Sequence, residues 1–281
     1  MRQLLISKII LLILLIVPLT IWADDATKKN EKYFSLVEDA DNAISEGNWA
    51  LAQEYLQQAM RLDPSNPTNV LLLSNLGMVQ FYDGRSDEAI ATLTNAHNIA
   101  PKSVTVLMNR ARIYTSTNQH ILASADYSTV IHLDSTMIEP RFYRAMLSLN
   151  AGKLDEAKTD IDTLIIKAPD DHRTNIAQAT LLMTIGEYQK AIPYLSTVIK
   201  NMPDASYYGH RALCYLQTND LSSATEDISN GLSLDPTDPE LYIYRAMLNK
   251  MRYRPDDAKA DAETAIKFGA NPHTVKALIG H

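Results

Sequence analysis

Apolar residues recur at three- and four-residue spacing through most of the chain, in short segments that come in pairs. This spacing places the apolar side chains on one face of a helix, so each pair predicts two amphipathic helices. A residue that tolerates the left-handed conformation ending a helix separates the two segments, at Gly47, Gly84, Asn118, Gly152, Gly186 and Asn219. The pattern therefore predicts a series of helical hairpins, most of them followed by a proline that stops the second helix.

The hairpins repeat with a fixed period. An alanine marks the second helix of each unit, at Ala52, Ala89, Ala123, Ala157, Ala191, Ala224 and Ala258, which are 37, 34, 34, 34, 33 and 34 residues apart. Twelve residues earlier each unit has another small residue, such as Gly77 or Ala145, which allows the two helices to approach closely. A hairpin of this size cannot bury its apolar face alone, so successive units must stack.

Two units depart from this period. The 37-residue first interval predicts a longer connection around residues 65–69. The last unit has Tyr253 where the others have Gly or Asn, with Pro255 two residues later, which predicts an interhelix turn of a different shape.

The pattern Leu73, Leu76-Gly77, Gly84, Ala89, Ala96 and Pro101 resembles the tetratricopeptide repeat, and all seven units follow it. The resemblance implies an all-α fold, a right-handed α-solenoid of seven helical hairpins. It also implies a scaffold that binds other proteins, without naming a partner.

The expected organisation has four parts. Residues 1–23 have a basic start, the apolar run IILLILLIV, a helix breaker at Pro18 and a small residue at Ala23, which is typical of a secretory signal peptide. Residues 24–32 are expected to be a flexible segment, 33–270 the repeats, and 271–281 a short helix that caps the last apolar face. An uncleaved membrane anchor is the alternative at the N-terminus, although its apolar run is shorter than the roughly 20 residues that span a bilayer. We expect an exported protein of the periplasm or cell envelope, or a secreted one.

Charge and cysteine content narrow the function classes. The net charge of −7 disfavours nucleic acid as a partner, because phosphate binding requires a cationic surface. The single cysteine, Cys214, cannot form an internal disulfide and lies in an apolar segment, so we expect it to be buried and inert.

An arginine directly precedes the small residue of the first helix in four units, and an aspartate follows it sixteen residues later on the second helix. The pairs are Arg110 and Asp126, Arg144 and Asp160, Arg211 and Asp227, and Arg245 and Asp261. In the fifth unit Gln178 replaces the arginine and Tyr194 the aspartate, so the two residue types occur together or not at all. We interpret the pairs as structural braces, since a neutralised arginine is poorly available to a ligand.

In the family that this sequence resembles, the first helix of each unit lines a concave groove. The corresponding positions predict an apolar, Met-rich surface for a partner segment, with the residues Met78, Phe81, Met108, Arg112, Phe142, Met146, Leu149, Met183, Leu213, Leu216, Met247 and Met251. The alternative is that these side chains pack between neighbouring units. The Lys–Asn–Arg set with which some family members hold a peptide carboxylate does not occur in successive units.

We find no pattern that predicts catalysis. The seven histidines are scattered, every glycine at a turn is isolated, and no G-x-S-x-G elbow occurs. We therefore expect a non-enzymatic adaptor for a protein or peptide, without cofactor or metal. The alternatives are a solute- or glycan-binding envelope protein and a membrane-tethered assembly factor.

Overall fold

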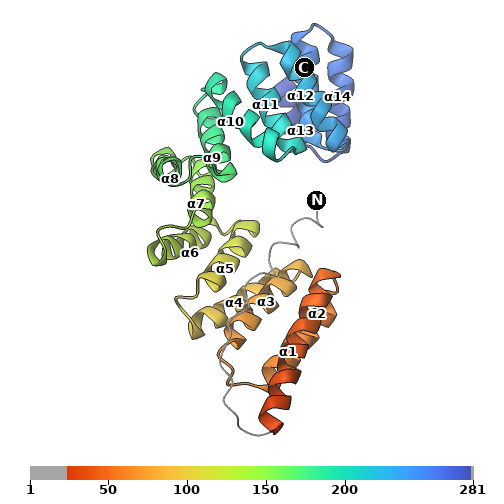
Figure 1. Cartoon of the computed structure of the whole chain (residues 1–281). Helices are drawn as coiled ribbons and strands as arrows, with labels where there is room; N and C mark the ends of the chain where they lie inside the picture. Colours follow the sequence, from red (N-terminus) through yellow and green to blue (C-terminus); the bar gives the residue numbers. More distant parts are fainter. Residues whose placement is uncertain (1–23, 280–281) are drawn as a thin grey trace. The chain divides into compact units, whose positions relative to one another are not determined.

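The computed structural model describes residues 24–279, which form fifteen helices and no strand (Figure 1). The predicted signal peptide, residues 1–23, lies outside the described residues. The helices are α1 Asp24–Ser45, α2 Trp49–Leu62, α3 Asn69–Tyr82, α4 Ser86–Ile99, α5 Val104–Ser116, α6 His120–Leu133, α7 Glu139–Asn150, α8 Leu154–Lys167, α9 His172–Thr184, α10 Tyr188–Asn201, α11 Ala205–Gln217, α12 Leu221–Leu234, α13 Pro239–Met251, α14 Pro255–Lys267 and α15 Pro272–Ile279. The all-α prediction of packed helical hairpins is confirmed.

Short turns join the two helices of each hairpin, as the sequence predicted. Glycines 47, 84, 152 and 186 and asparagines 118 and 219 all have positive φ, between 59° and 84°. In the turn after α7, the Gly152 N–H donates to Leu149 and the Lys153 N–H donates to Ser148, which satisfies carbonyls that the helix end leaves open.

The last of these turns corrects our expectation. Tyr253 has φ of 58°, and the Arg254 N–H donates to the Asn249 carbonyl as Lys153 does to Ser148. The turn between α13 and α14 thus has the same backbone form as the glycine turns, because the helix end imposes it whatever the residue.

The longer first interval is confirmed as a six-residue connection, 63–68, between α2 and α3. The buried Tyr33 holds this loop, since its hydroxyl lies 2.8 Å from Thr68 Oγ1 and 3.0 Å from Asn69 Oδ1. The loop is therefore fastened to α1 rather than loose.

Residues 24–32 require a second correction, because they form the beginning of α1 and not a segment without secondary structure. Within them, Lys29 Nζ donates to Asp63 Oδ1 at 2.9 Å, which ties the helix to the end of α2. Residues 27–32 are exposed, so this part of α1 lies on the surface, and Tyr33 is the first buried side chain after it.

The chain divides into two compact units, one ending at Pro140 and one beginning at Arg141. In the first unit, Tyr33, Leu56 and Leu72 form one buried cluster, and Leu93, Val106 and Ile113 belong to another. Small residues at the helix crossings are fully buried in both clusters, as the repeat pattern requires.

In the second unit, buried clusters follow the hairpins α9–α10, α11–α12 and α13–α14. Helix α15 packs on α13 and α14, and its Val275 is buried against Ile243, Ala246 and Ala265. This short helix therefore covers the apolar face of the last hairpin.

Candidate partner-binding surface

Each of the four Arg–Asp pairs forms and joins the two helices of one hairpin. In the pair between α5 and α6, Arg110 Nε and Nη2 both donate to Asp126 at 2.8 Å, one bond to each carboxylate oxygen. The Arg144 and Arg211 pairs have the same fork, with distances of 2.7–2.8 Å, whereas Arg245 donates twice to a single oxygen of Asp261. Hydrogen bonds to the aspartates raise the pKa of all four guanidinium groups.

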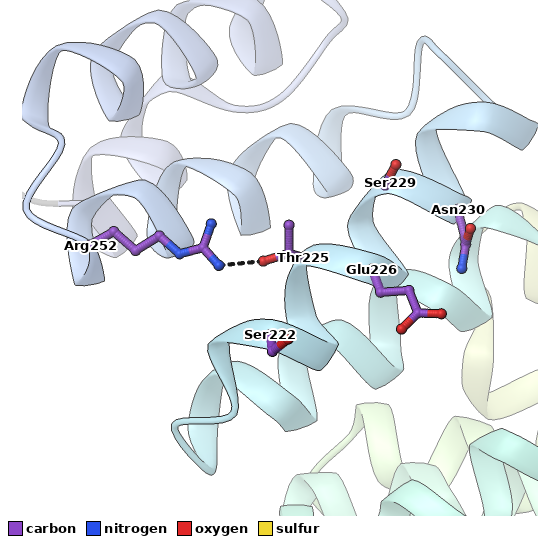
Figure 2. A pocket seen from close by; sticks show the side chains of 6 residues that line it. All are labelled: Ser222, Thr225, Glu226, Ser229, Asn230 and Arg252. Atoms are coloured by element: carbon purple, nitrogen blue, oxygen red, sulfur yellow. Dashed lines mark hydrogen bonds between the residues drawn. The ribbon is translucent and has the colours of Figure 1, made fainter.

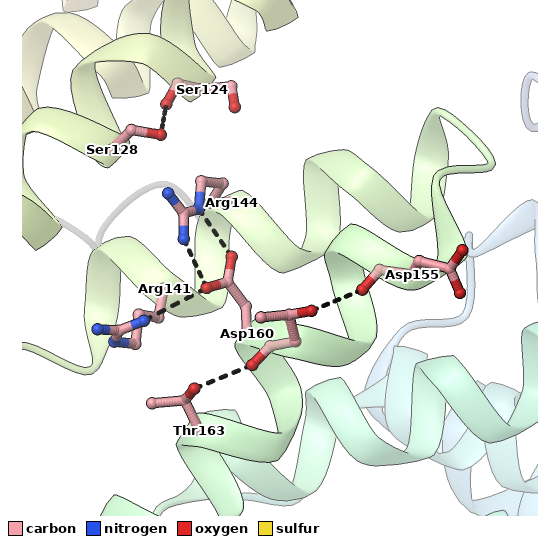
Figure 3. Close-up of polar contacts among 8 residues, drawn as sticks. Ser124, Ser128, Arg141, Arg144, Asp155, Asp160 and Thr163 are labelled. Carbon is pink, nitrogen blue, oxygen red and sulfur yellow. Dashed lines mark hydrogen bonds and ion pairs between the residues drawn. The ribbon is translucent and has the colours of Figure 1, made fainter.

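The carboxylates of these pairs are buried, and each arginine donates to its aspartate along the planar fork, so most of its charge is neutralised within the hairpin. Figure 3 shows Asp160 between Arg144 and a second arginine, Arg141, whose Nη1 donates to it at 3.4 Å. Sequence reasoning missed Arg141, although its position three residues before Arg144 on the same helix face was a usable signal.

The hairpin α9–α10 has no such pair. Gln178 takes the arginine position, and its Oε1 is buried with no hydrogen-bond partner in the described part of the chain. Apolar contacts among Ala179, Leu195 and the half-buried Tyr194 hold this hairpin together instead.

Four of the twelve groove positions are core residues, which corrects the sequence prediction. Met78, Met108, Leu149 and Leu216 are only 3–6% exposed. Their side chains fill the space between neighbouring helices, so they cannot contact a partner without unfolding. The first-helix positions that the resemblance assigned to a groove are shared between core and surface.

The remaining apolar positions are accessible to different degrees. In the second unit Phe142, Met146, Met183, Leu213 and Met247 are half-buried and Met251 is exposed. Met183 and Met247 also pack against the buried clusters of their own hairpins. These residues thus have one side in the core and one side toward solvent.

In the first unit, three neighbouring aromatic side chains, rather than the predicted methionines, are accessible. Phe81 lies 5.6 Å from Tyr82, and the Tyr82 ring stacks on Trp49 with a centroid distance of 5.4 Å. Sequence reasoning assigned Phe81 and Tyr82 to the groove but missed Trp49, because Trp49 belongs to the preceding hairpin. The side chain of Arg112 is held by Asn109 and by Glu139, whose Oε1 lies 2.6 Å away, so it is no isolated cation.

Two titratable side chains outside the pairs, Cys214 and His210, have pKa values that burial shifts. Burial raises the pKa of Cys214 to about 12 and lowers the pKa of His210, so both groups are neutral at physiological pH. Residues 24–279 contain no group of three or more His, Cys, Asp or Glu side chains placed to hold a metal ion. In the same range we find no helix with the length and apolar character needed to cross a membrane.

Comparison with known proteins identifies the repeat in two segments of the chain. The sequence model of the tetratricopeptide repeat matches residues 38–104 and 176–239. The tetratricopeptide repeat is confirmed in both segments. A tetratricopeptide repeat protein from Parabacteroides merdae ATCC 43184 has a similar crystal structure, with a TM-score of 0.72, 28% identity, and coverage of 89% of this chain and 98% of that one.

Curated proteins are similar to parts of this chain. Human DnaJ homolog subfamily C member 7 is 33% identical over 118 residues, which are 41% of this chain and 24% of that protein. The chain thus spans about a quarter of that relative. Human mitochondrial import receptor subunit TOM34 is 22% identical over 243 residues, covering 69% of this chain and 78% of that protein. The Cut9–Hcn1 structure, with a TM-score of 0.68 and 13% identity, shows the shared fold alone.

Proposed function

We propose that this protein is a non-enzymatic scaffold that binds an apolar segment of a partner protein on the first helices of its tetratricopeptide hairpins. The general role follows from the repeats, since proteins of this fold mediate protein–protein interaction. The observation that carries the finer proposal is the half-buried row of apolar side chains in the second unit, Phe142, Met146, Met183, Leu213 and Met247.

Side chains in this position suit a variable partner. Methionine is unbranched and polarisable, so it adapts its shape to different apolar surfaces without a large loss of packing. The Arg–Asp braces contribute indirectly, because they hold the first helix of each hairpin in place while taking no part in the contact. Binding would then bury apolar area on an already ordered surface.

The test is a pair of variants. We expect Met146→Glu combined with Met183→Glu to leave the helical content intact and to remove partner binding, because each Glu puts a charge where apolar contact is required. The wild type and the variant serve as parallel baits. Each protein that they recover is then purified and titrated against the wild type and against the variant by calorimetry. A negative heat-capacity change with the wild type and no binding to the variant is the expected result.

Two results would overturn the proposal. If both baits bind the same purified partner with equal affinity, the methionine row is not the contact surface. If the variant fails to fold, the two methionines are core residues, and Thr180→Glu, at a half-buried polar position of the same helix α9, then tests the surface without that defect.

We further propose that the protein acts outside the cytoplasm, in the envelope or in the periplasm, as the pattern of residues 1–23 predicts. Cell fractionation together with the N-terminal mass of the exported protein tests this. We expect the mass of a chain that begins at Asp24, whereas the mass of a chain that retains residues 1–23 would favour the membrane-tethered alternative.

A further inference from the structure

The turn between α13 and α14 differs from the other hairpin turns in its side chains but not in its backbone. The end of α13 and the turn, Lys250–Arg254, read Lys-Met-Arg-Tyr-Arg, and three of the five residues are cationic. Tyr253 has a left-handed φ of 58°, a conformation in which a bulky side chain is strained and glycine is not. Four of the equivalent turns use glycine at this position.

The strained tyrosine makes no use of its side chain within the fold. Tyr253 is 93% exposed, the highest value among the exposed large hydrophobic residues of the described chain. A Cβ placed on Gly84, Gly152 or Gly186 likewise has no atom within 4 Å, so this turn position directs its side chain into solvent. Glycine would adopt this positive φ without strain, so folding alone gives no reason for an aromatic residue here.

The residue before Tyr253, Arg252, joins the turn to helix α12. Arg252 Nη2 donates to the Leu221 carbonyl at 3.0 Å. It also donates to Thr225 Oγ1 at 2.6 Å (Figure 2). Beside it, a shallow polar depression runs along α12 and is lined by Ser222, Thr225, Glu226, Ser229 and Asn230. The exposed Tyr253 thus directly follows an arginine that is hydrogen-bonded to α12 and that lines this depression.

We propose that this turn, Lys250–Arg254, is a second docking surface, which binds a short acidic segment of a partner protein. Arginine and tyrosine are enriched at protein interfaces, and the planar guanidinium matches a carboxylate. The arginine side chains favour an acidic peptide, while the hydroxyl and amide groups on α12 suit its backbone. Asp256 and Asp257, in the first turn of α14, and Glu226 offset part of the positive charge, so a short segment with a few carboxylates fits this surface better than an extended polyanion such as nucleic acid or an anionic membrane. Met251 is one of the predicted groove positions, but none of the five side chains on which the proposed function rests lies within Lys250–Arg254, so this surface goes beyond that function.

The experiment measures binding of a fluorescently labelled peptide of alternating Glu and Ala, with an alternating Lys and Ala peptide of equal length as the charge control. We expect the wild type to bind the acidic peptide only, and to bind it more weakly as salt is added. Arg254→Glu should weaken binding by at least about tenfold, the effect of one charge-assisted hydrogen bond. Lys153→Glu is the matched control, since Lys153 follows Gly152 as Arg254 follows Tyr253, and it should bind like the wild type.

Tyr253→Gly separates a binding role from a structural one. We expect this variant to bind the acidic peptide several-fold more weakly and to melt at the same or a higher temperature, because glycine relieves the strain. A lower melting temperature would make Tyr253 structural and overturn the proposal. So would equal binding of both peptides, binding of neither, or a preference for vesicles containing phosphatidylglycerol over the peptide. The Met146→Glu and Met183→Glu variant should still bind the acidic peptide, so failure of one surface is distinguishable from failure of the other.

Discussion

Removing one partner of the Arg110–Asp126 pair should destabilise the protein far more than removing both. The two side chains are only 10% and 9% exposed, and both of their hydrogen bonds measure 2.8 Å. Arg110→Met leaves a buried carboxylate without its cation, and Asp126→Leu leaves a buried guanidinium without its anion. Each single change should therefore lower the free energy of unfolding by about 3–5 kcal/mol.

The double variant replaces both charges by apolar side chains of similar volume and should lose only about 1 kcal/mol or less. In the other hairpins, the loss of stability should depend on how exposed the arginine is. The side chain of Arg245 is 40% exposed, so water screens its pair, and Arg245→Met should lower the free energy of unfolding by roughly 1 kcal/mol. Asp160 is a poorer choice for this test, because Arg141 remains beside it when Arg144 is removed.

The assay is urea unfolding followed by far-ultraviolet circular dichroism, with hydrogen exchange to detect unfolding of separate hairpins, since repeat proteins can unfold in parts. Lys153→Met serves as the control, because its ion pair with Glu156 is about 60% exposed on both sides and should contribute nothing measurable. If the double variant loses as much stability as the two single variants together, the residues do not interact and the brace interpretation is wrong.

Three further predictions concern single positions. Cys214 should react with a thiol reagent at neutral pH only when its hairpin opens, because burial raises its pKa to about 12; labelling as fast as that of a free thiol would contradict this. Burial also lowers the pKa of His210, so the unfolded chain binds the proton more readily, and stability should be complete above a pH of about 6.5 and fall as the pH drops through the lowered value. Thermal melts of the wild type and of His210→Gln, above a pH of about 6.5 and below the lowered pKa, test this prediction. If the melting temperatures of both proteins change equally with pH, His210 is not the cause. Gly77→Ala should lower the free energy of unfolding by about 1–3 kcal/mol, because its Cβ would lie 2.7 Å from Leu93 Cγ. Leu93→Ala removes this Cγ, so in urea unfolding it should cost less in the Gly77→Ala background than in the wild type.

Much of the fold could be predicted from the sequence, because the repeat is built from local interactions. The apolar period predicted the helices, Gly or Asn predicted the turns, and the sixteen-residue spacing placed each Arg opposite its Asp within one hairpin. All of these contacts join residues of the same repeat unit, so chain spacing alone specifies them. Even the six-residue connection before α3 was visible as a longer interval.

Tertiary structure decided which of these side chains reach solvent. Met78 and Met146 occupy the same position of the repeat, yet the first is buried and the second is half-buried, because the neighbouring helices cover them differently. Trp49 and Tyr82 meet only because successive hairpins pack together, and Tyr253 takes a glycine conformation because the helix end imposes it. A repeating sequence therefore determines the hairpin, whereas the exposed surface of each hairpin depends on the one packed beside it.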